Sequence, residues 1–296
     1  MIHYGVEGSD PPCEHVDCPG ENAEMRNIYA GSAIRVKKRE GDLILCFYGL
    51  GNHPAVQANL DLKVIEPSIG YDVASVFAPF RAFTSYAQQH MFYGRNNMLM
   101  NPSWFDAVIP NAFDVDEFSF QSKKQDYLLC FGRVIASKGI LLAIELAQKT
   151  GYKLIIAGPG SLEHVGIEKV PDFVEMRGMC NAQQRQDLMS NAKALLAPTL
   201  YVEPFGNMVV EAQLSGTPTI TTDWGAFSET NPHGVTGYRC RDWNDFYHAV
   251  KNINRIDPKI CRDWAAANYN LDIVHDMFDR YIQKIIKSDF YYSPRY

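Results

Sequence analysis

Two glutamates flank a Pro-Phe-Gly turn in the apolar stretch YVEPFGNMVVEAQLSGTP, residues 201–218. Gly206 at the start of a helix exposes free backbone N–H groups and the positive end of the helix dipole, which together favour an anion. Glu203 precedes that helix and Glu211 lies about two turns into it, so the two carboxylates serve different partners. Each could accept hydrogen bonds from a sugar diol on either side of a bound phosphate. The alternative is a dipole charge at Glu203 and an exposed or capped Glu211.

A second group of residues follows an apolar run at FGRVIASKG, residues 131–139. Gly132 ends the predicted strand, Arg133 leaves it and Lys138 enters the next helix. A planar guanidinium fork and a compact ammonium charge at one point suit a diphosphate. Two exposed cations on a surface turn are the alternative interpretation.

Short apolar runs that end in glycine alternate with longer helical patterns, which predicts an α/β fold with a doubly wound parallel sheet in the second half. Ligands bind such sheets at the carboxyl ends of the strands, where these residues lie. We predict Ser137 as a helix N-cap and Gly151 as the stop of the same helix. The predicted strands cover 127–132, 152–158, 173–178, 194–199 and 217–223, and the predicted helices cover 139–150, 181–193 and 206–214.

The first half follows the same pattern less regularly. Phe80, Phe83, Ala87 and Met91 share one face at helical spacing, which predicts a helix over 78–94. The polar segment 114–125 is predicted as an interdomain linker. An apolar stripe along the last helix predicts that it packs on another surface. Strands are predicted at 1–5, 42–49, 62–67 and 105–110, and the stripe consists of Val274, Met277, Phe278, Tyr281 and Ile285.

The composition limits the class of protein and its partners. The chain has 296 residues, 46% of them hydrophobic, and a net charge of -6. It can therefore bury a large core, and it lacks the excess of cations that nucleic-acid binding requires. Seven scattered cysteines indicate reduced thiols in a cytoplasmic protein. CEHVDC, residues 13–18, has no second pair of ligands at zinc spacing, so we read it as a loop with free thiols.

Membrane contact is predicted to be weak. No apolar run approaches the roughly 20 residues that span a bilayer. The basic run RVKKRE, residues 35–40, could touch an acidic lipid surface, although four cations more commonly form a solvated edge.

Five segments in order resemble the GT-B retaining glycosyltransferases of family four. They are VIPNAFD (108–114), FGRVIASKG (131–139), AGPGS (157–161), EPFGNMVVE (203–211) and the GAFSE turn (225–229). The resemblance implies two Rossmann-like domains facing a cleft. The resemblance also implies that the first domain, residues 1–113, is shortened, because the chain begins at what looks like the family's second strand. Residues 114–125 link it to a nucleotide-sugar domain at 126–268, and 269–296 cross back to the first domain.

The resemblance also implies roles for the candidate residues. Arg133 and Lys138, beside Gly132, would hold the donor diphosphate, and Glu211 would bind the ribose hydroxyls. Glu203 would contact the donor sugar. The backbone amides of Phe205, Gly206 and Asn207 would lie beside it, and Arg177 and Gly178 would flank the base. Glu229 matches the glutamate of a Gly-Gly-x-x-Glu turn, although Ala226 replaces the second glycine.

On the acceptor side His53 is the candidate for the family's histidine, and Ser68 and Gly70 could line the acceptor pocket. The implied reaction transfers a hexose from a UDP- or GDP-sugar to a carbohydrate acceptor with retention at the anomeric carbon. It needs no bound metal, because Arg, Lys and helix amides carry the charge, and no cofactor besides the donor. Two alternatives stay open: a nucleotide-sugar-binding module that has lost catalysis, and a sugar-nucleotide epimerase of the same fold.

Overall fold

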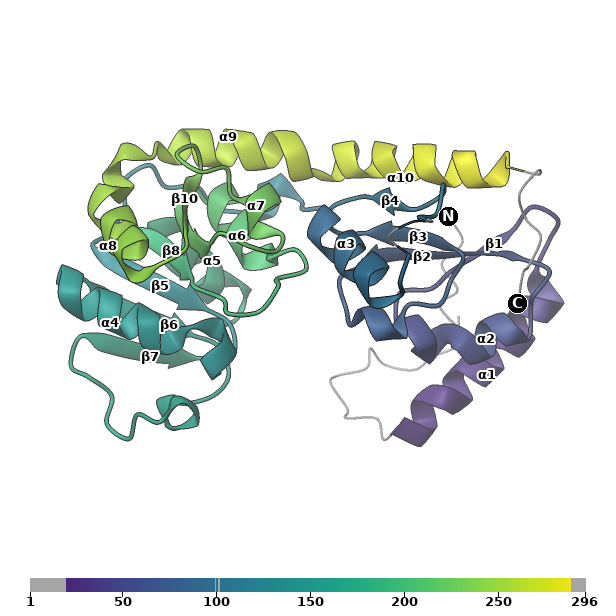
Figure 1. The fold of residues 1–296 in the computed structure, drawn as a ribbon, viewed down its shortest axis with the longest axis horizontal. Coiled ribbons are helices and arrows are strands. Elements are labelled where there is room, and N and C mark those ends of the chain that lie inside the picture. The colour runs from purple at the N-terminus through teal and green to yellow at the C-terminus, as the bar shows by residue number, and fades with distance from the viewer. Residues whose placement is uncertain (1–19, 99, 101, 289–296) are drawn as a thin grey trace.

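Two parallel sheets form two Rossmann-like domains, as the sequence predicts (Figure 1). The computed structural model describes residues 20–98, 100 and 102–288. The first sheet has the order β1-β2-β3-β4 and the second the order β10-β9-β8-β5-β6-β7. The strands of the first sheet are β1 (Leu43–Leu45), β2 (Lys63–Ile69), β3 (Phe80–Phe83) and β4 (Ala107–Val108). Those of the second are β5 (Tyr127–Phe131), β6 (Lys153–Ala157), β7 (Val174–Gly178), β8 (Ala194–Ala197), β9 (Thr219–Thr222) and β10 (Gly237–Cys240).

The helices cover the sheets and connect them. In the first domain they are α1 (Gly20–Lys37), α2 (His53–Gln57) and α3 (Tyr86–Arg95). In the second they are α4 (Ile140–Thr150), α5 (Ala182–Asn191), α6 (Asn207–Leu214), α7 (Phe227–Thr230) and α8 (Trp243–Asn252), followed by α9 (Pro258–Tyr269) and α10 (Leu271–Ile286). The predicted strand at 1–5 lies outside the described residues.

The central strands of the second sheet are buried on both faces, which explains why β5 and β8 are apolar throughout. Leu128 and Ile156 pack with α4 and α8 on one face, and Leu129 and Leu195 pack with α5 and α6 on the other. The predicted strands and helices of this half are confirmed, including Gly151 as the left-handed residue that ends α4. Burial raises the pKa of Cys130 to about 12, so this thiol is protonated at neutral pH.

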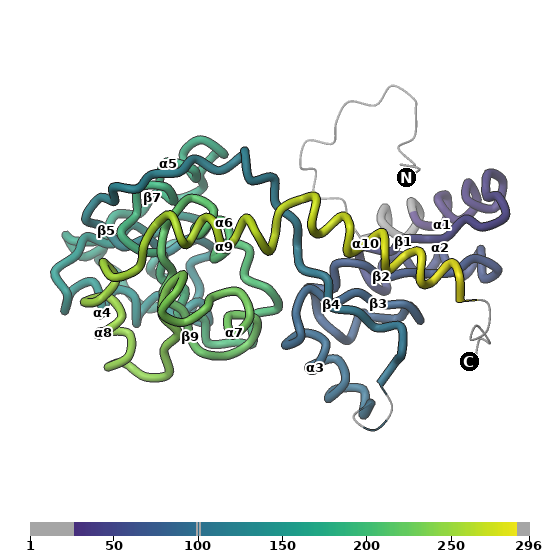
Figure 2. Tube along the Cα trace, turned by 90° about the horizontal axis from the view of Figure 1, so that it is seen from above, coloured from purple at the N-terminus to yellow at the C-terminus, as the bar shows by residue number. Residues whose placement is uncertain are grey.

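The last helix crosses to the first sheet (Figure 2). Val274, Tyr281 and Ile285 of α10 are buried against Ile65 and Phe80. The predicted apolar stripe is therefore a packing face. Through it the first domain packs against α10, which continues from the second domain.

The predicted helix over 78–94 is wrong in its first half. Phe80–Phe83 forms β3, which pairs with β2 and β4 in the middle of the first sheet. A strand that is buried on both faces needs no alternation, so its apolar spacing can imitate a helix. α3 begins only after Ser85, whose side chain accepts from the N–H of Gln88 at 3.0 Å.

The predicted N-cap at Ser137 is also wrong. Ser137 lies inside a short 3-10 turn, Ala136–Lys138, and Gly139 with φ +69° precedes α4. The turn brings Lys138 to the end of β5 before the helix starts.

The basic run at 35–40 makes contacts within the protein. Lys38 pairs with Asp61, and Arg35 donates to the carbonyl oxygen of Ala58 at 2.9 Å. In the part of the chain that the structure describes, no helix is both long and apolar enough to cross a membrane.

Lys124 ties the segment before β5 to the second domain. Its ammonium donates to the carbonyl oxygens of Ser190 at 2.7 Å and Ser215 at 3.1 Å, and to the hydroxyl of Thr217 at 3.0 Å. Lys124→Met leaves these acceptors without their donor, so we expect it to lower the free energy of unfolding by about 2 to 4 kcal/mol. Urea unfolding measures the loss. Lys123→Met at the exposed neighbouring position is the control. An equal loss of unfolding free energy in both variants would contradict the anchoring role of Lys124.

Candidate donor-binding site

The carboxyl ends of β5, β6 and β7 meet at one edge of the second sheet through backbone hydrogen bonds. The N–H of Gly132 donates to Ala157 at 2.8 Å, and that of Gly158 donates to Gly178 at 2.7 Å. Gly158 has φ +137°, and a Cβ there would lie 2.1 Å from the carbonyl oxygen of Gly132. Only glycine permits this close approach of the two strand ends.

Lys138 and Glu203 meet beside this edge. The Lys138 ammonium lies 3.0 Å from the Glu203 carboxylate and 4.8 Å from the centre of the Tyr201 ring. The Tyr201 hydroxyl donates to the same carboxylate at 2.9 Å. Burial first, and then the nearby charge of Glu203, raise the pKa of Tyr201, while Lys138 lowers it. The phenol therefore remains a donor, and it holds Glu203 next to the cation.

The backbone around Glu203 is fixed by the 225–229 turn. The N–H of Ala226 donates to the carbonyl oxygen of Glu203 at 2.9 Å. Gly206 adopts a left-handed conformation with φ +85° and precedes α6, whose first N–H groups have no partner within the helix. Phe205 is a core residue, stacked on Phe113 with ring centres 6.4 Å apart.

Glu211 has a different partner. It is 7% exposed and forms an ion pair with Arg185 of α5, whose guanidinium carbon lies 5.6 Å from the centre of the Phe131 ring. Both ends of this pair lie on the α5 and α6 side of the sheet. The sequence gives no sign of Arg185, because the contact depends on how the two helices pack.

Arg133 is exposed and lines a small pocket together with Gly132, Lys138, Thr199 and Met208. Thr199 at the end of β8 is fully buried, and within the described chain its hydroxyl has no hydrogen-bond partner. The pocket thus combines two cations and one buried hydroxyl. Thr199 is a further polar group that sequence reasoning did not identify.

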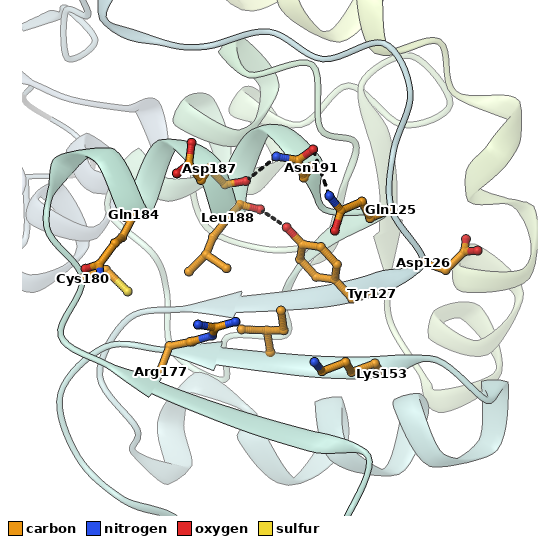
Figure 3. A pocket seen from close by; sticks show the side chains of 11 residues that line it. Gln125, Asp126, Tyr127, Lys153, Arg177, Cys180, Gln184, Asp187, Leu188 and Asn191 are labelled. Carbon is orange, nitrogen blue, oxygen red and sulfur yellow. Dashed lines mark hydrogen bonds between the residues drawn. The ribbon is translucent and has the colours of Figure 1, made fainter.

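A larger cavity of about 560 Å³ lies between α5 and the face of β5, β6 and β7 (Figure 3). Tyr127, Ile155 and Leu188 provide its apolar lining, and Arg177 and Cys180 line it near the end of β7. Arg177 and Lys153 both pair with Glu175, which neutralises part of their charge. The structure therefore places Arg177 in this cavity, apart from Arg133 and Lys138, which it does not include. Gly178 follows at the strand end with φ +60°.

The acceptor-side residues lie in the first domain. His53 begins α2, and its ring meets Phe77 edge-on with the ring centres 5.2 Å apart. Ser68 has φ +55° within β2, a strained conformation for a residue with a side chain. Gly70 follows that strand, where a Cβ would lie 3.4 Å from the Thr84 hydroxyl.

Across the two domains Asn111 donates to the side-chain oxygen of Asn207 at 2.8 Å. This hydrogen bond joins the end of the first domain to the first residue of α6.

In the described ranges, no group of three or more His, Cys, Asp and Glu side chains gathers as a metal site would require. The CEHVDC run lies outside those ranges. Asp114 of the Asp-Val-Asp run at 114–116 caps a short turn and accepts from the N–H of Asp116 at 3.0 Å.

The second domain matches a known family, and the whole fold matches solved enzymes. Residues 125–255 match the glycosyl transferases group 1 family. A glycogen synthase of Mycobacterium tuberculosis is 29% identical over 162 residues, 49% of this chain and 39% of the relative, so the match spans less than half of that relative.

Two solved structures share the fold. A glycosyltransferase involved in avilamycin A biosynthesis has a TM-score of 0.60 at 24% identity, with 70% of this chain and 64% of that one covered. The Anabaena protein HepE, in complex with UDP and glucose, has a TM-score of 0.69 at 14% identity over 86% and 80% of the two chains. The described chain therefore has the two-domain GT-B fold, and its residues 125–255 are similar to the glycosyl transferases group 1.

Proposed function

We propose that this protein transfers a hexose from a UDP- or GDP-sugar to a carbohydrate acceptor, with retention at the anomeric carbon. The observation that carries the proposal is the Lys138 and Glu203 pair, held by Tyr201 at the carboxyl end of β5 and next to the start of α6. A cation, an acidic group and a helix N-terminus at one point suit a sugar joined to a diphosphate. The match of residues 125–255 to the glycosyl transferases group 1 supports the same chemistry.

In this reaction the protein acts mainly through charge. Breaking the bond to the diphosphate leaves negative charge on the phosphate and positive charge on the sugar ring. Lys138, Arg133 and the amides at the start of α6 stabilise the phosphate, and Glu203 faces the sugar. The departing phosphate oxygen takes the proton of the acceptor hydroxyl on the same face, so the new bond forms with retention.

The remaining candidates hold the ends of the two substrates. Glu211 accepts from the ribose hydroxyls, and Gly178 and Arg177, which lines the cavity under α5, flank the base. On the first domain His53, Ser68 and Gly70 line the acceptor pocket. The donor contacts all belong to the second domain, whereas the acceptor contacts belong to the first.

A thermal-shift screen with UDP-glucose, UDP-galactose, UDP-N-acetylglucosamine and GDP-mannose tests the donor class. A ligand at 100 times its Kd stabilises the folded state by about 2.7 kcal/mol, enough to raise the Tm measurably. The donor that stabilises the protein should then release free sugar when no acceptor is present, and NMR of the first product reports the anomeric configuration. If none of the four nucleotide sugars raises the Tm, and UDP and GDP alone do not raise it either, the proposal is contradicted.

A further inference from the structure

Glu229 binds the first domain rather than a group of its own domain. It lies in α7, and its carboxylate accepts from the backbone N–H groups of Tyr86 at 2.8 Å and Ala87 at 2.9 Å, the first residues of α3 (Figure 1). These N–H groups have no partner within their helix, and the positive end of the helix dipole faces the carboxylate. The contact is therefore a charge-assisted link between the two domains.

The same turn of the first domain also contacts the segment that carries Glu203. The Ser85 hydroxyl donates to the carbonyl oxygen of Pro204 at 2.6 Å, and the Thr84 hydroxyl approaches that oxygen at 3.3 Å. Pro204 directly follows Glu203, so the start of α3 reaches the donor side at the residue next to the acidic group.

Together these contacts connect Glu203, Glu229 and the start of α3 to one another. The N–H of Ala226 donates to the Glu203 carbonyl oxygen, and α7 with Glu229 follows Ala226 directly. If the domains separate, the two N–H groups of α3 lose their acceptor and the Pro204 carbonyl loses its donors at the same time. The position of the Glu203 backbone is thus linked to the closeness of the domains.

We propose that Glu229 is a positioning residue that holds the two domains closed and thereby fixes Glu203 for sugar transfer. Because its carboxylate accepts from the N–H groups at the start of α3, its role acts through the contact between the domains. The role rests on the proposed function for its effect on turnover, whereas its effect on domain closure is independent of that function.

Glu229→Ala is expected to lower kcat at least about 10-fold, roughly 1.4 kcal/mol in activation free energy. The Kd for UDP or GDP should stay within about twofold, because Lys138, Arg133 and α6 all belong to the second domain and an unchanged donor site keeps its affinity. Small-angle X-ray scattering should show a larger radius of gyration for the variant. Glu229→Gln keeps the oxygen acceptor without the charge and should be intermediate. Glu145→Ala, the same change at an exposed position of α4, is the control.

A second variant removes one of the two backbone N–H groups that donate to the Glu229 carboxylate. Tyr86 is the first residue of α3 and its side chain is 58% exposed, so Tyr86→Pro deletes one N–H at a position where helices favour proline. It should lower kcat and enlarge the protein as Glu229→Ala does. Tyr86→Ala, which keeps the N–H, should do neither.

The outcomes separate the two proposals. If Glu229→Ala and Tyr86→Pro match their controls in scattering and kcat, the positioning role is wrong while sugar transfer stands. A loss of nucleotide affinity in Glu229→Ala would place Glu229 on the donor and also overturn the role. Absence of nucleotide binding in the wild type refutes the proposed function, and the scattering comparison then still decides whether Glu229 closes the domains.

Discussion

Glu211→Ala is expected to weaken UDP or GDP binding about 100-fold, since the carboxylate would give up two hydrogen bonds to ribose hydroxyls worth roughly 1.5 kcal/mol each. Glu211 is buried, and its partner Arg185 comes from a neighbouring helix, so the carboxylate is held in one place before the ligand arrives. Calorimetry with UDP and GDP measures the change.

The ligand provides a sharper form of this test. Wild-type protein should bind UDP more tightly than 2′,3′-dideoxy-UDP, and Glu211→Ala should bind the two alike, because the group that distinguishes them is gone. Arg185→Gln breaks the same ion pair but keeps the carboxylate, so it should preserve the preference. If Glu211→Ala retains the wild-type preference for the hydroxylated ligand, the ribose assignment is wrong.

Local signals explain why the second half was predictable. Strands β5 and β6 are apolar runs that end before Gly132 and Gly158, and both glycines have φ +137°, a backbone conformation that other residues avoid. The same glycines mark the sheet edge where Arg133 and Lys138 lie. The sequence therefore located the second sheet and the edge of it at which we propose that an anion binds.

Contacts between elements explain what the sequence missed. Arg185 sits in the polar run QQRQD, residues 183–187, and nothing local separates it from its neighbours. Glu229 belongs to a recognisable motif, but its partner is the start of α3, about 140 positions earlier in the chain. The sequence predicts a helix at β3 because the place of this segment between two strands is a tertiary feature. Partners of this kind follow from packing, which a single sequence does not state.

Glu203→Gln is expected to lower kcat by about 100- to 1000-fold, the usual effect of removing one preorganised charged group from a reacting centre. The affinity for UDP, in contrast to kcat, is not expected to fall. In the structure the carboxylate lies 3.0 Å from the Lys138 ammonium and neutralises it. Without that charge Lys138 is free to pair with phosphate, so UDP should bind at least as tightly as to the wild type.

Lys138→Met provides the matching half of this experiment. It removes the cation but keeps an unbranched side chain only one atom shorter, and it should weaken UDP binding about 10-fold or more, because a charged hydrogen bond is worth about 1.5 to 3 kcal/mol. Since Glu203 then remains buried without its cation, the Tm of this variant should also fall. Two halves of one ion pair would thus change nucleotide affinity in opposite directions. If both variants weaken UDP binding equally, the pair holds the loop together and Lys138 does not bind the donor phosphate.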